Sequence, residues 1–198
     1  MNPVPDATFS RVYPCHARRK RPLFAALALA VTFVLAGCGG GGSGSGSGGT
    51  TTTVPGARVA GNGFTFAAPD SWQVSRAAST VTVRPAVAGP TLASVTRLTL
   101  RKRYDPTLFA KVTRELDRVT AALAAKLNGK VIARRTVLVH GIRSRQYDVA
   151  YEKEGTGVID RITFVLRGKR EFYVLCRWPA DEGEPAACGL LQSSFSLR

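Results

Sequence analysis

Apolar residues recur at every second position in three short stretches of the chain, and this period predicts β-strands. In the first stretch, Phe64, Phe66 and Ala68 are expected to share one face of a strand. Residues 79–84 and residues 93–103 show the same alternation. The chain therefore starts its globular part with short strands rather than with helices.

The apolar period changes to three and four residues after Asp105, which predicts a long amphipathic helix. Asp105 is a favourable N-cap and Pro106 suits the first helical position, while Asn128-Gly129 favours a helix end. The apolar positions between these signals are Leu108, Val112, Leu116, Val119, Leu123 and Leu127. We expect this stripe to pack against a sheet.

Three or four further strands are predicted after the helix, because extended stretches follow one another with only short glycine-containing turns between them. Their expected ranges are 130–140, 143–153, 158–167 and 170–178. Strands connected in this way form an antiparallel meander. The last two carry apolar residues on both faces, so we expect both faces of the sheet to be covered. A short helix at residues 185–194 is expected near the C-terminus.

The order of these elements resembles the Mog1/PsbP fold, an α+β fold in which an antiparallel sheet lies within an αβα sandwich. Three residue patterns carry the resemblance. They are Gly63–Trp72 with its Pro-x-x-Trp turn, the approach from Val139-His140-Gly141 to Tyr147-Asp148-Val149, and Tyr173–Cys176 followed by Cys188–Leu191 and Ser193-Ser194-Phe195. The resemblance spans residues 61–196 and implies a long central helix and a short C-terminal helix.

The resemblance implies binding rather than catalysis. Mog1-like members bind a small GTPase, and PsbP-like members bind a photosynthetic membrane complex. Because these partners differ, the resemblance transfers no site residue, cofactor or partner to this chain.

The N-terminal segment has the pattern of a secretory signal. Four basic residues, 18–21, precede an apolar run of 14 residues at 23–36, which is shorter than the about 20 residues that span a membrane. Leu35-Ala36-Gly37-Cys38 resembles the bacterial lipobox, and this resemblance implies acylation of Cys38 and cleavage just before it. An uncleaved signal anchor and an ordinary signal peptide are the alternatives.

Three parts of the chain follow from this interpretation. Residues 1–37 are expected to be a lipoprotein signal peptide, residues 38–56 a lipidated cysteine with a Gly/Ser/Thr linker, and residues 57–198 a globular domain. A linker of this composition buries no apolar surface and is expected to be flexible. We therefore expect a lipid-anchored protein on the extracytoplasmic face of the cell membrane.

Basic residues exceed acidic ones, with a net charge of +15 at pH 7. Residues 1–37 hold five of the 28 basic and one of the 13 acidic residues, which leaves +11 for the remainder. This excess favours anionic neighbours such as lipid head groups, wall polymers or an acidic protein, and nucleic acid is a poor candidate outside the cytoplasm. A basic surface without a ligand is the alternative.

Arginines on two predicted strand stretches form a candidate anion-binding patch. Within each stretch the arginines are expected to share one strand face, although the sequence does not define how the strands pair. The candidate residues are Arg97, Arg101, Arg103, Arg143 and Arg145.

Cys176 and Cys188 remain as a pair when Cys15 is removed with the signal and Cys38 is acylated. In an oxidising compartment we expect them to form a disulfide between the last strand and the C-terminal helix. Two buried thiols are the alternative. Two cysteines alone are too few ligands for a metal site.

His140 is the one histidine of the expected domain, and its position before Gly141 indicates an exposed turn rather than a catalytic base. The sequence contains no nucleophile elbow, phosphate loop or zinc spacing, so we expect no catalytic residue, cofactor or metal. The leading hypothesis is a non-enzymatic module that binds another envelope component. A carrier or hydrolase with a pocket between sheet and helix, and electrostatic docking to anionic lipid or wall polymer, are the alternatives.

Overall fold

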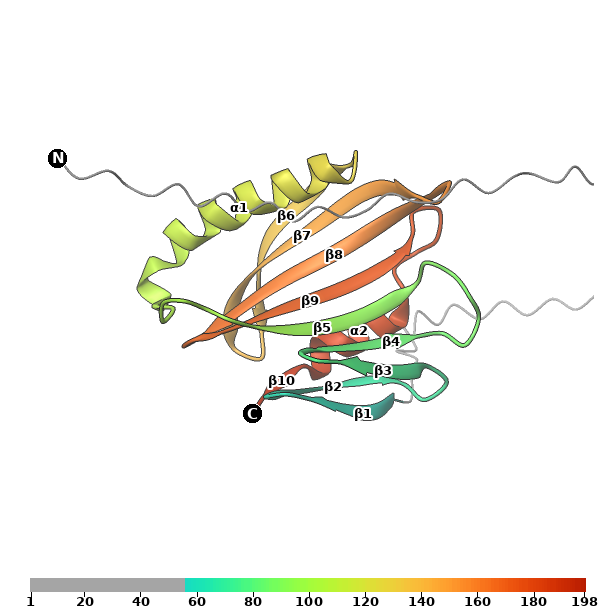
Figure 1. The fold of residues 1–198 in the computed structure, drawn as a ribbon, viewed down its shortest axis with the longest axis horizontal. Helices are drawn as coiled ribbons and strands as arrows, with labels where there is room; N and C mark the ends of the chain where they lie inside the picture. Colours follow the sequence, from blue (N-terminus) through green and yellow to red (C-terminus); the bar gives the residue numbers. More distant parts are fainter. Residues whose placement is uncertain (1–55) are drawn as a thin grey trace, which may run out of the picture. The chain divides into compact units, whose positions relative to one another are not determined.

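A seven-stranded antiparallel sheet is the main layer of the fold, which the computed structural model describes for residues 56–198 (Figure 1). Its strand order is β3-β4-β5-β9-β8-β7-β6. The strands are β3 (Gln73–Ala77), β4 (Thr80–Arg84), β5 (Leu92–Thr99), β6 (Lys130–Val139), β7 (Ile142–Lys153), β8 (Thr156–Arg167) and β9 (Arg170–Pro179). The predicted meander is confirmed, because β6 to β9 pair in chain order. The predicted signal peptide, Cys38 and most of the predicted linker lie outside the described residues.

Helix α1 (Phe109–Lys126) connects β5 in the middle of the sheet to β6 at its edge. A 3-10 turn, η1 (Pro106–Leu108), precedes it, and the Asp105 carboxylate accepts a 2.9 Å hydrogen bond from the Thr107 amide. At the other end Asn128 has a φ of 52°, and the Gly129 amide donates to the Ala124 carbonyl at 2.8 Å. Both predicted helix boundaries are therefore confirmed, with the capping chemistry expected of them.

The buried face of α1 differs from the predicted apolar stripe. Leu108 and Val119 are each 49 % exposed, whereas Thr120 and Ala124 are fully buried. The helix is turned so that polar residues also face the sheet, among them Asp117, whose carboxylate contacts β7. The prediction that all six apolar positions pack inward is wrong for these two.

A second layer covers the opposite face of the large sheet. It consists of a small sheet with the order β1-β2-β10 and of helix α2 (Ala186–Ser194). The strands of the small sheet are β1 (Gly56–Gly61), β2 (Phe64–Pro69) and β10 (Ser196–Leu197). The sequence patterns predicted β2 and α2 but not β1, and they did not separate β2 from the main sheet.

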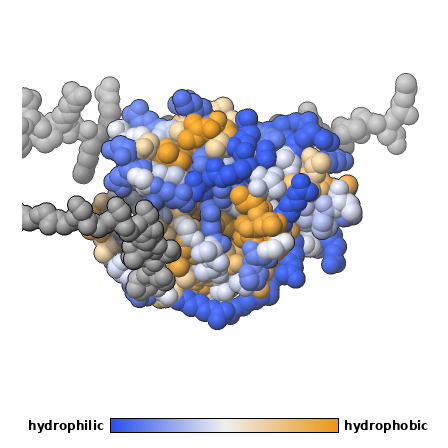
Figure 2. All heavy atoms as spheres, turned by 180° about the vertical axis from the view of Figure 1, so that it is seen from behind, coloured by the Kyte–Doolittle hydropathy of each residue, from blue (hydrophilic) through white to orange (hydrophobic). Residues whose placement is uncertain are grey.

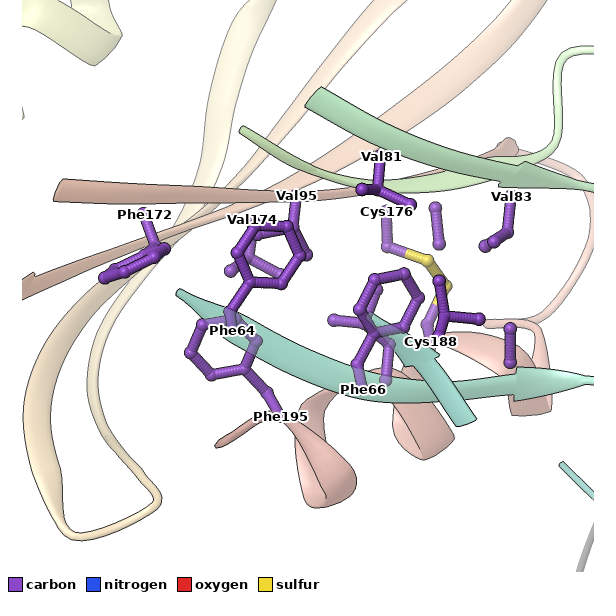
Figure 3. Packing of buried hydrophobic residues seen from close by; sticks show 14 of the residues in the cluster. Phe64, Phe66, Val81, Val83, Val95, Phe172, Val174, Cys176, Cys188 and Phe195 are labelled. Atoms are coloured by element: carbon purple, nitrogen blue, oxygen red, sulfur yellow. A yellow bond between two sulfur atoms is a disulfide. The ribbon is translucent and has the colours of Figure 1, made fainter. Parts of the chain in front are cut away.

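Aromatic residues fill the core between these two layers (Figure 3). The ring centroid of Phe64 lies 5.9 Å from that of Phe172 on β9 and 6.1 Å from that of Phe195, which follows α2. Phe66 on β2 stacks beside Phe64 at 6.2 Å. Burying side chains of this size contributes about 1.5–3 kcal/mol each, so this cluster holds the small sheet on the large one.

The predicted disulfide between Cys176 and Cys188 is confirmed. Both cysteines lie in the same core, and their Cα atoms are 5.8 Å apart (Figure 3). The bond joins β9 to α2 and so fixes the C-terminal helix on the sheet.

Alternate residues of β9 point to opposite layers. Phe172 and Val174 face the aromatic core, whereas Tyr173 and Leu175 pack against the cluster beneath α1. The two helices therefore cover opposite faces of the large sheet, and the predicted α+β fold is confirmed.

Within residues 56–198, no helix is both long and apolar enough to cross a membrane. Figure 2 shows that hydrophilic residues cover much of one face, with separate hydrophobic patches between them.

Candidate binding site at the start of helix α1

The chain segment between β5 and α1 is fixed against the turn that joins β8 to β9. The Leu100 amide donates to the Lys169 carbonyl at 2.9 Å, and the Tyr104 amide donates to the Gly168 carbonyl at 2.7 Å. Gly168 has a φ of 59°, a conformation that glycine adopts without strain. These contacts place the segment between the sheet and the start of the helix.

This placement corrects one prediction from the sequence. Strand β5 ends at Thr99, so Arg101 and Arg103 lie on the exposed segment after it and do not share a strand face with Arg97. The segment leaves the ladder because its amides pair with the β8–β9 turn instead of continuing along β9.

An apolar groove of about 500 Å³ lies between this segment, the first half of α1 and the sheet. Its apolar wall is formed by Leu100, Leu108, Val112, Leu116 and Leu166. Three carboxylates, of Asp105, Glu115 and Glu171, also line it, together with the basic side chains of Arg101, Lys102 and Arg103. Burial raises the pKa of the Glu171 carboxyl above its ordinary value.

A second cavity of about 670 Å³ adjoins the groove and shares Arg103, Tyr104 and Leu166 with it. Arg143 from β7 and Arg167 at the end of β8 complete its basic wall, and no carboxylate lines it. Arg103, Arg143 and Arg167 form no ion pair with any residue in the described part of the chain. We call this the arginine cavity.

Arg143 is held over an aromatic ring rather than by a carboxylate. Its guanidinium carbon lies 4.4 Å from the centroid of the Phe109 ring at the start of α1. This cation–π contact orients the side chain and leaves its N–H donors available. Planar guanidinium donors suit bidentate binding of carboxylate or phosphate.

The structure brings together three of the five predicted patch residues and separates two. Arg101 and Arg103 line the groove, and Arg103 and Arg143 line the arginine cavity. Arg145 lies on the same face of β7 as Arg143, but it donates to the Asp117 carboxylate at 3.0 Å. Arg97 points to the other layer, where it donates to the side chain of Asn62.

Sequence reasoning missed Tyr104, Arg167 and Glu171 at this site. Arg167 and Glu171 flank the Gly168-Lys169 turn, which was predicted, so a signal for their position existed. What the sequence lacked was the pairing of residues 100–104 with that turn, because this contact depends on the chain's path after β5.

Other arginines on the sheet are neutralised within the fold. Asp148 accepts from Arg161 at 2.9 Å and from Arg135 at 2.9 Å, and Asp160 accepts from Arg177. Burial alone would raise the pKa of Asp148, but the hydrogen bonds and charges of the two arginines outweigh it and hold the pKa below its ordinary value. These pairs stabilise the sheet and contrast with the unpaired arginines of the cavity.

His140 lies in the turn between β6 and β7, is exposed and has a φ of 49°. It lines the arginine cavity together with Tyr104, but no carboxylate, serine, threonine or cysteine is among the lining residues. Within residues 56–198, no group of three or more His, Cys, Asp or Glu side chains is arranged to hold a metal ion. The geometry at this end of the molecule supports anion binding.

Solved structures with a similar fold include CyanoP, the cyanobacterial PsbP of Synechocystis sp. PCC 6803. It matches with a TM-score of 0.55 and 12% sequence identity, over 78% of this chain and 99% of CyanoP. The chain has a PsbP-like fold. At this identity, the likeness of this PsbP-like chain to CyanoP concerns the fold alone.

Two further solved structures match parts of this chain. A Bacteroides thetaiotaomicron VPI-5482 protein matches with a TM-score of 0.50 and 10% identity, over 68% of this chain, and this chain spans only 45% of that protein. LpqN, involved in cell envelope biogenesis of Mycobacterium tuberculosis, matches with a TM-score of 0.45 and 15% identity, over 72% of this chain and 90% of LpqN. No protein-family model and no curated protein matches the sequence.

Proposed function

We propose that this chain is a lipid-anchored, extracytoplasmic binding protein that takes an anionic component of the cell envelope at the arginine cavity. The observation that carries the binding proposal is the set of three arginines, Arg103, Arg143 and Arg167, around one cavity without a carboxylate in its wall. Cations that have no ion pair gain most from an added anion.

The anchoring part of the proposal rests on the sequence. Leu35-Ala36-Gly37-Cys38 follows an apolar run and precedes a glycine-serine tract, as a lipobox would. Two or more acyl chains on one residue give stable membrane attachment, whereas one chain gives only marginal binding. Cys38→Ser is therefore expected to abolish incorporation of labelled palmitate. Equal labelling of the variant and the parent chain would contradict the lipid anchor.

A crosslinking experiment tests the binding part. The full chain is crosslinked in intact cells at low and high salt, and Arg103→Glu combined with Arg143→Glu is compared with the parent chain. The matched control is Arg76→Glu with Arg84→Glu, because these two arginines are exposed on β3 and β4 away from the cavity. We expect the first pair to lose capture of the anionic component and the control pair to keep it. Equal capture by both would refute the arginine cavity as the site.

A carrier for a small ligand is the second candidate function. The observation that favours it is the apolar groove of about 500 Å³ between sheet and helix, a size typical of ligand pockets, which span about 300–1,000 Å³. The two candidates are compatible, because groove and cavity adjoin.

A further inference from the structure

We infer that the apolar groove and the arginine cavity form one two-part site for a single-chain amphiphile with an anionic head group. The inference deepens the proposed function and rests on it, because it names the ligand class for the same site. The acyl chain lies in the groove and the head group binds the arginines.

The groove provides an apolar surface that the described part of the chain covers only in part. Leu108 is 49 % exposed, and Val112 and Leu116 are only half-buried on the side of α1 that faces the sheet. Leu100 and Leu166 form the opposite wall. Leu166 is already buried, so an acyl chain laid between the walls would mainly remove the exposed parts of Leu108, Val112 and Leu116 from water, which is the driving force for burying hydrocarbon.

The head group is placed by the residues that the two spaces share. Arg103, Tyr104 and Leu166 line both, so a molecule can extend from one space into the other. The Tyr104 backbone is fixed to the β8–β9 turn, so this shared wall is held in place by main-chain contacts. Beyond it, Arg143 and Arg167 can bind a phosphate or carboxylate group.

Acidic residues in the groove define the direction of the ligand. Basic and acidic side chains offset one another in the groove, where Asp105, Glu115 and Glu171 are in the lining together with Arg101, Lys102 and Arg103, whereas the arginine cavity has no carboxylate in its wall. An anionic head group in the groove would meet carboxylates beside the basic side chains, and in the cavity it meets basic side chains without a carboxylate. The amphiphile therefore enters with its chain toward Glu171 and its head toward Arg143.

The half of α1 that is buried against the sheet lies away from the groove. Thr120 and Ala124 are the fully buried residues of the helix, and the Asp117 contact to β7 is next to them. The groove is lined by residues of the first half, from Leu108 to Leu116. This arrangement leaves the groove open to a ligand without displacing the buried part of the helix.

Photo-crosslinking of the full chain in native membranes tests the inference. The probe is dodecyl phosphate with a diazirine in its alkyl chain, and labelled peptides are identified by mass spectrometry. We expect labels on α1 and on the peptide around Leu166 to Glu171. Each methylene removed from a competitor is expected to weaken competition roughly fourfold, so decyl phosphate should compete roughly fifteenfold less well than dodecyl phosphate.

Two variants on the same helix separate groove binding from general surface binding. Val112→Trp fills the groove and is expected to reduce labelling at least tenfold, whereas Val119→Trp adds the same side chain at an exposed position outside it. Equal labelling of both variants would overturn the groove assignment. The competitor series does not depend on either variant and keeps the test decisive if Val112→Trp fails to fold.

The controls separate failure of the inference from failure of the proposed function. If glycerol 3-phosphate competes as well as dodecyl phosphate, the arginine cavity binds anions but the groove takes no chain, and the inference fails alone. A second outcome has two parts: neutral dodecyl maltoside competes as well as dodecyl phosphate, and the double variant Arg103→Gln with Arg143→Gln is labelled like the parent chain. In that case the arginine charges play no part in binding, and the inference and the proposed function both fail. Labels spread over the whole surface would also overturn the inference.

Discussion

The Tyr147 hydroxyl on β7 donates a 2.7 Å hydrogen bond to the Asp117 carboxylate on α1. Arg145 donates to the same carboxylate oxygen at 3.0 Å, and the Arg145 guanidinium lies 5.4 Å from the Tyr147 ring centroid. This polar contact joins α1 to the sheet in addition to the apolar packing of Leu116, Leu123 and Ala124 on the cluster beneath the helix. Burial and the Asp117 carboxylate raise the pKa of Tyr147 to about 12, so the hydroxyl keeps its proton at neutral pH.

Removing this hydrogen bond should loosen the helix without disturbing the core. Tyr147→Phe keeps the ring and its packing on Phe164 but leaves Asp117 with one partner fewer. We expect the free energy of unfolding to fall by about 1 kcal/mol, and by about 1–3 kcal/mol for Asp117→Ala, measured by urea denaturation. Glu115→Ala is the control, because its pair with Arg118 is exposed on the same helix and should contribute under about 0.5 kcal/mol. Equal losses for Asp117→Ala and Glu115→Ala would contradict a specific role of the contact.

The disulfide should contribute strongly to stability because it closes the aromatic core. Cys176 and Cys188 are separated by 12 positions in the sequence, and a loop of this order stabilises the folded state by about 3 kcal/mol in the chain-entropy model. Reductant should lower the free energy of unfolding of the parent chain by about this amount. Cys176→Ala with Cys188→Ala should be equally destabilised and no longer respond to reductant. An equal free energy of unfolding of the parent chain with and without reductant would contradict the disulfide.

Asp148 should make stability depend on acidity. Its folded pKa is depressed, so the stability that it contributes is present above its unfolded pKa of about 3.9 and is lost as pH falls through the folded value. Asp148 and Arg161 are 10% and 13% exposed in their side chains, and breaking so buried a pair costs about 3–5 kcal/mol. We therefore expect Asp148→Asn to be less stable at neutral pH and to lose less on acidification than the parent chain.

Urea denaturation from neutral pH down to about pH 3 measures this dependence. The series has to reach this acidity because the stability contributed by Asp148 is lost only below its unfolded pKa of about 3.9. Glu154→Gln is the control, because the Glu154 side chain is 85% exposed and pairs only with Lys153. Parallel pH profiles for Asp148→Asn and the parent chain would show that another carboxylate is responsible.

The same substitution should have opposite effects at two glycines. A Cβ on Gly129, just after α1, would lie 2.4 Å from the Ala150 carbonyl oxygen and 2.6 Å from the Tyr151 Cβ, so the backbone must shift. We expect Gly129→Ala to destabilise the fold by about 1–3 kcal/mol. A Cβ on Gly189 in α2 meets nothing within 4 Å, and Gly189→Ala should stabilise by about 0.5–1 kcal/mol through helix propensity. Thermal denaturation of the two variants measures both signs, and a stabilised Gly129→Ala would contradict the close approach.

Local chemistry explains which parts of the fold could be predicted. The start of α1 at Asp105-Pro106 and its end at Asn128-Gly129 depend on neighbouring residues only, and both were predicted. Strand β1 could not be recognised, because its one fully buried residue is Val59 and the rest of its pattern is small or polar. The separation of β2 from the large sheet is a tertiary effect that no local pattern encodes.

The candidate site was predicted only in part, for the same reason. Arg103 and Arg143 are 40 positions apart in the sequence and line one cavity because the segment after β5 pairs with the β8–β9 turn. Arg145 met the same sequence criterion as Arg143, but Asp117 approaches it from α1 and neutralises it. Counting arginines on a strand face cannot distinguish a free cation from a paired one.

The two ends of the described chain meet on one strand, since β1 and β10 both pair with β2. Strands β6 to β9 need only their immediate neighbours and can pair as each is synthesised. Strand β2 pairs along its second edge with Ser196 and Leu197, which lie 131 and 133 positions after their partners Thr65 and Phe64 in the sequence. Strand β2 therefore keeps one edge open until this distant segment has been made, and truncation before Ser196 would leave this apolar strand open to aggregation.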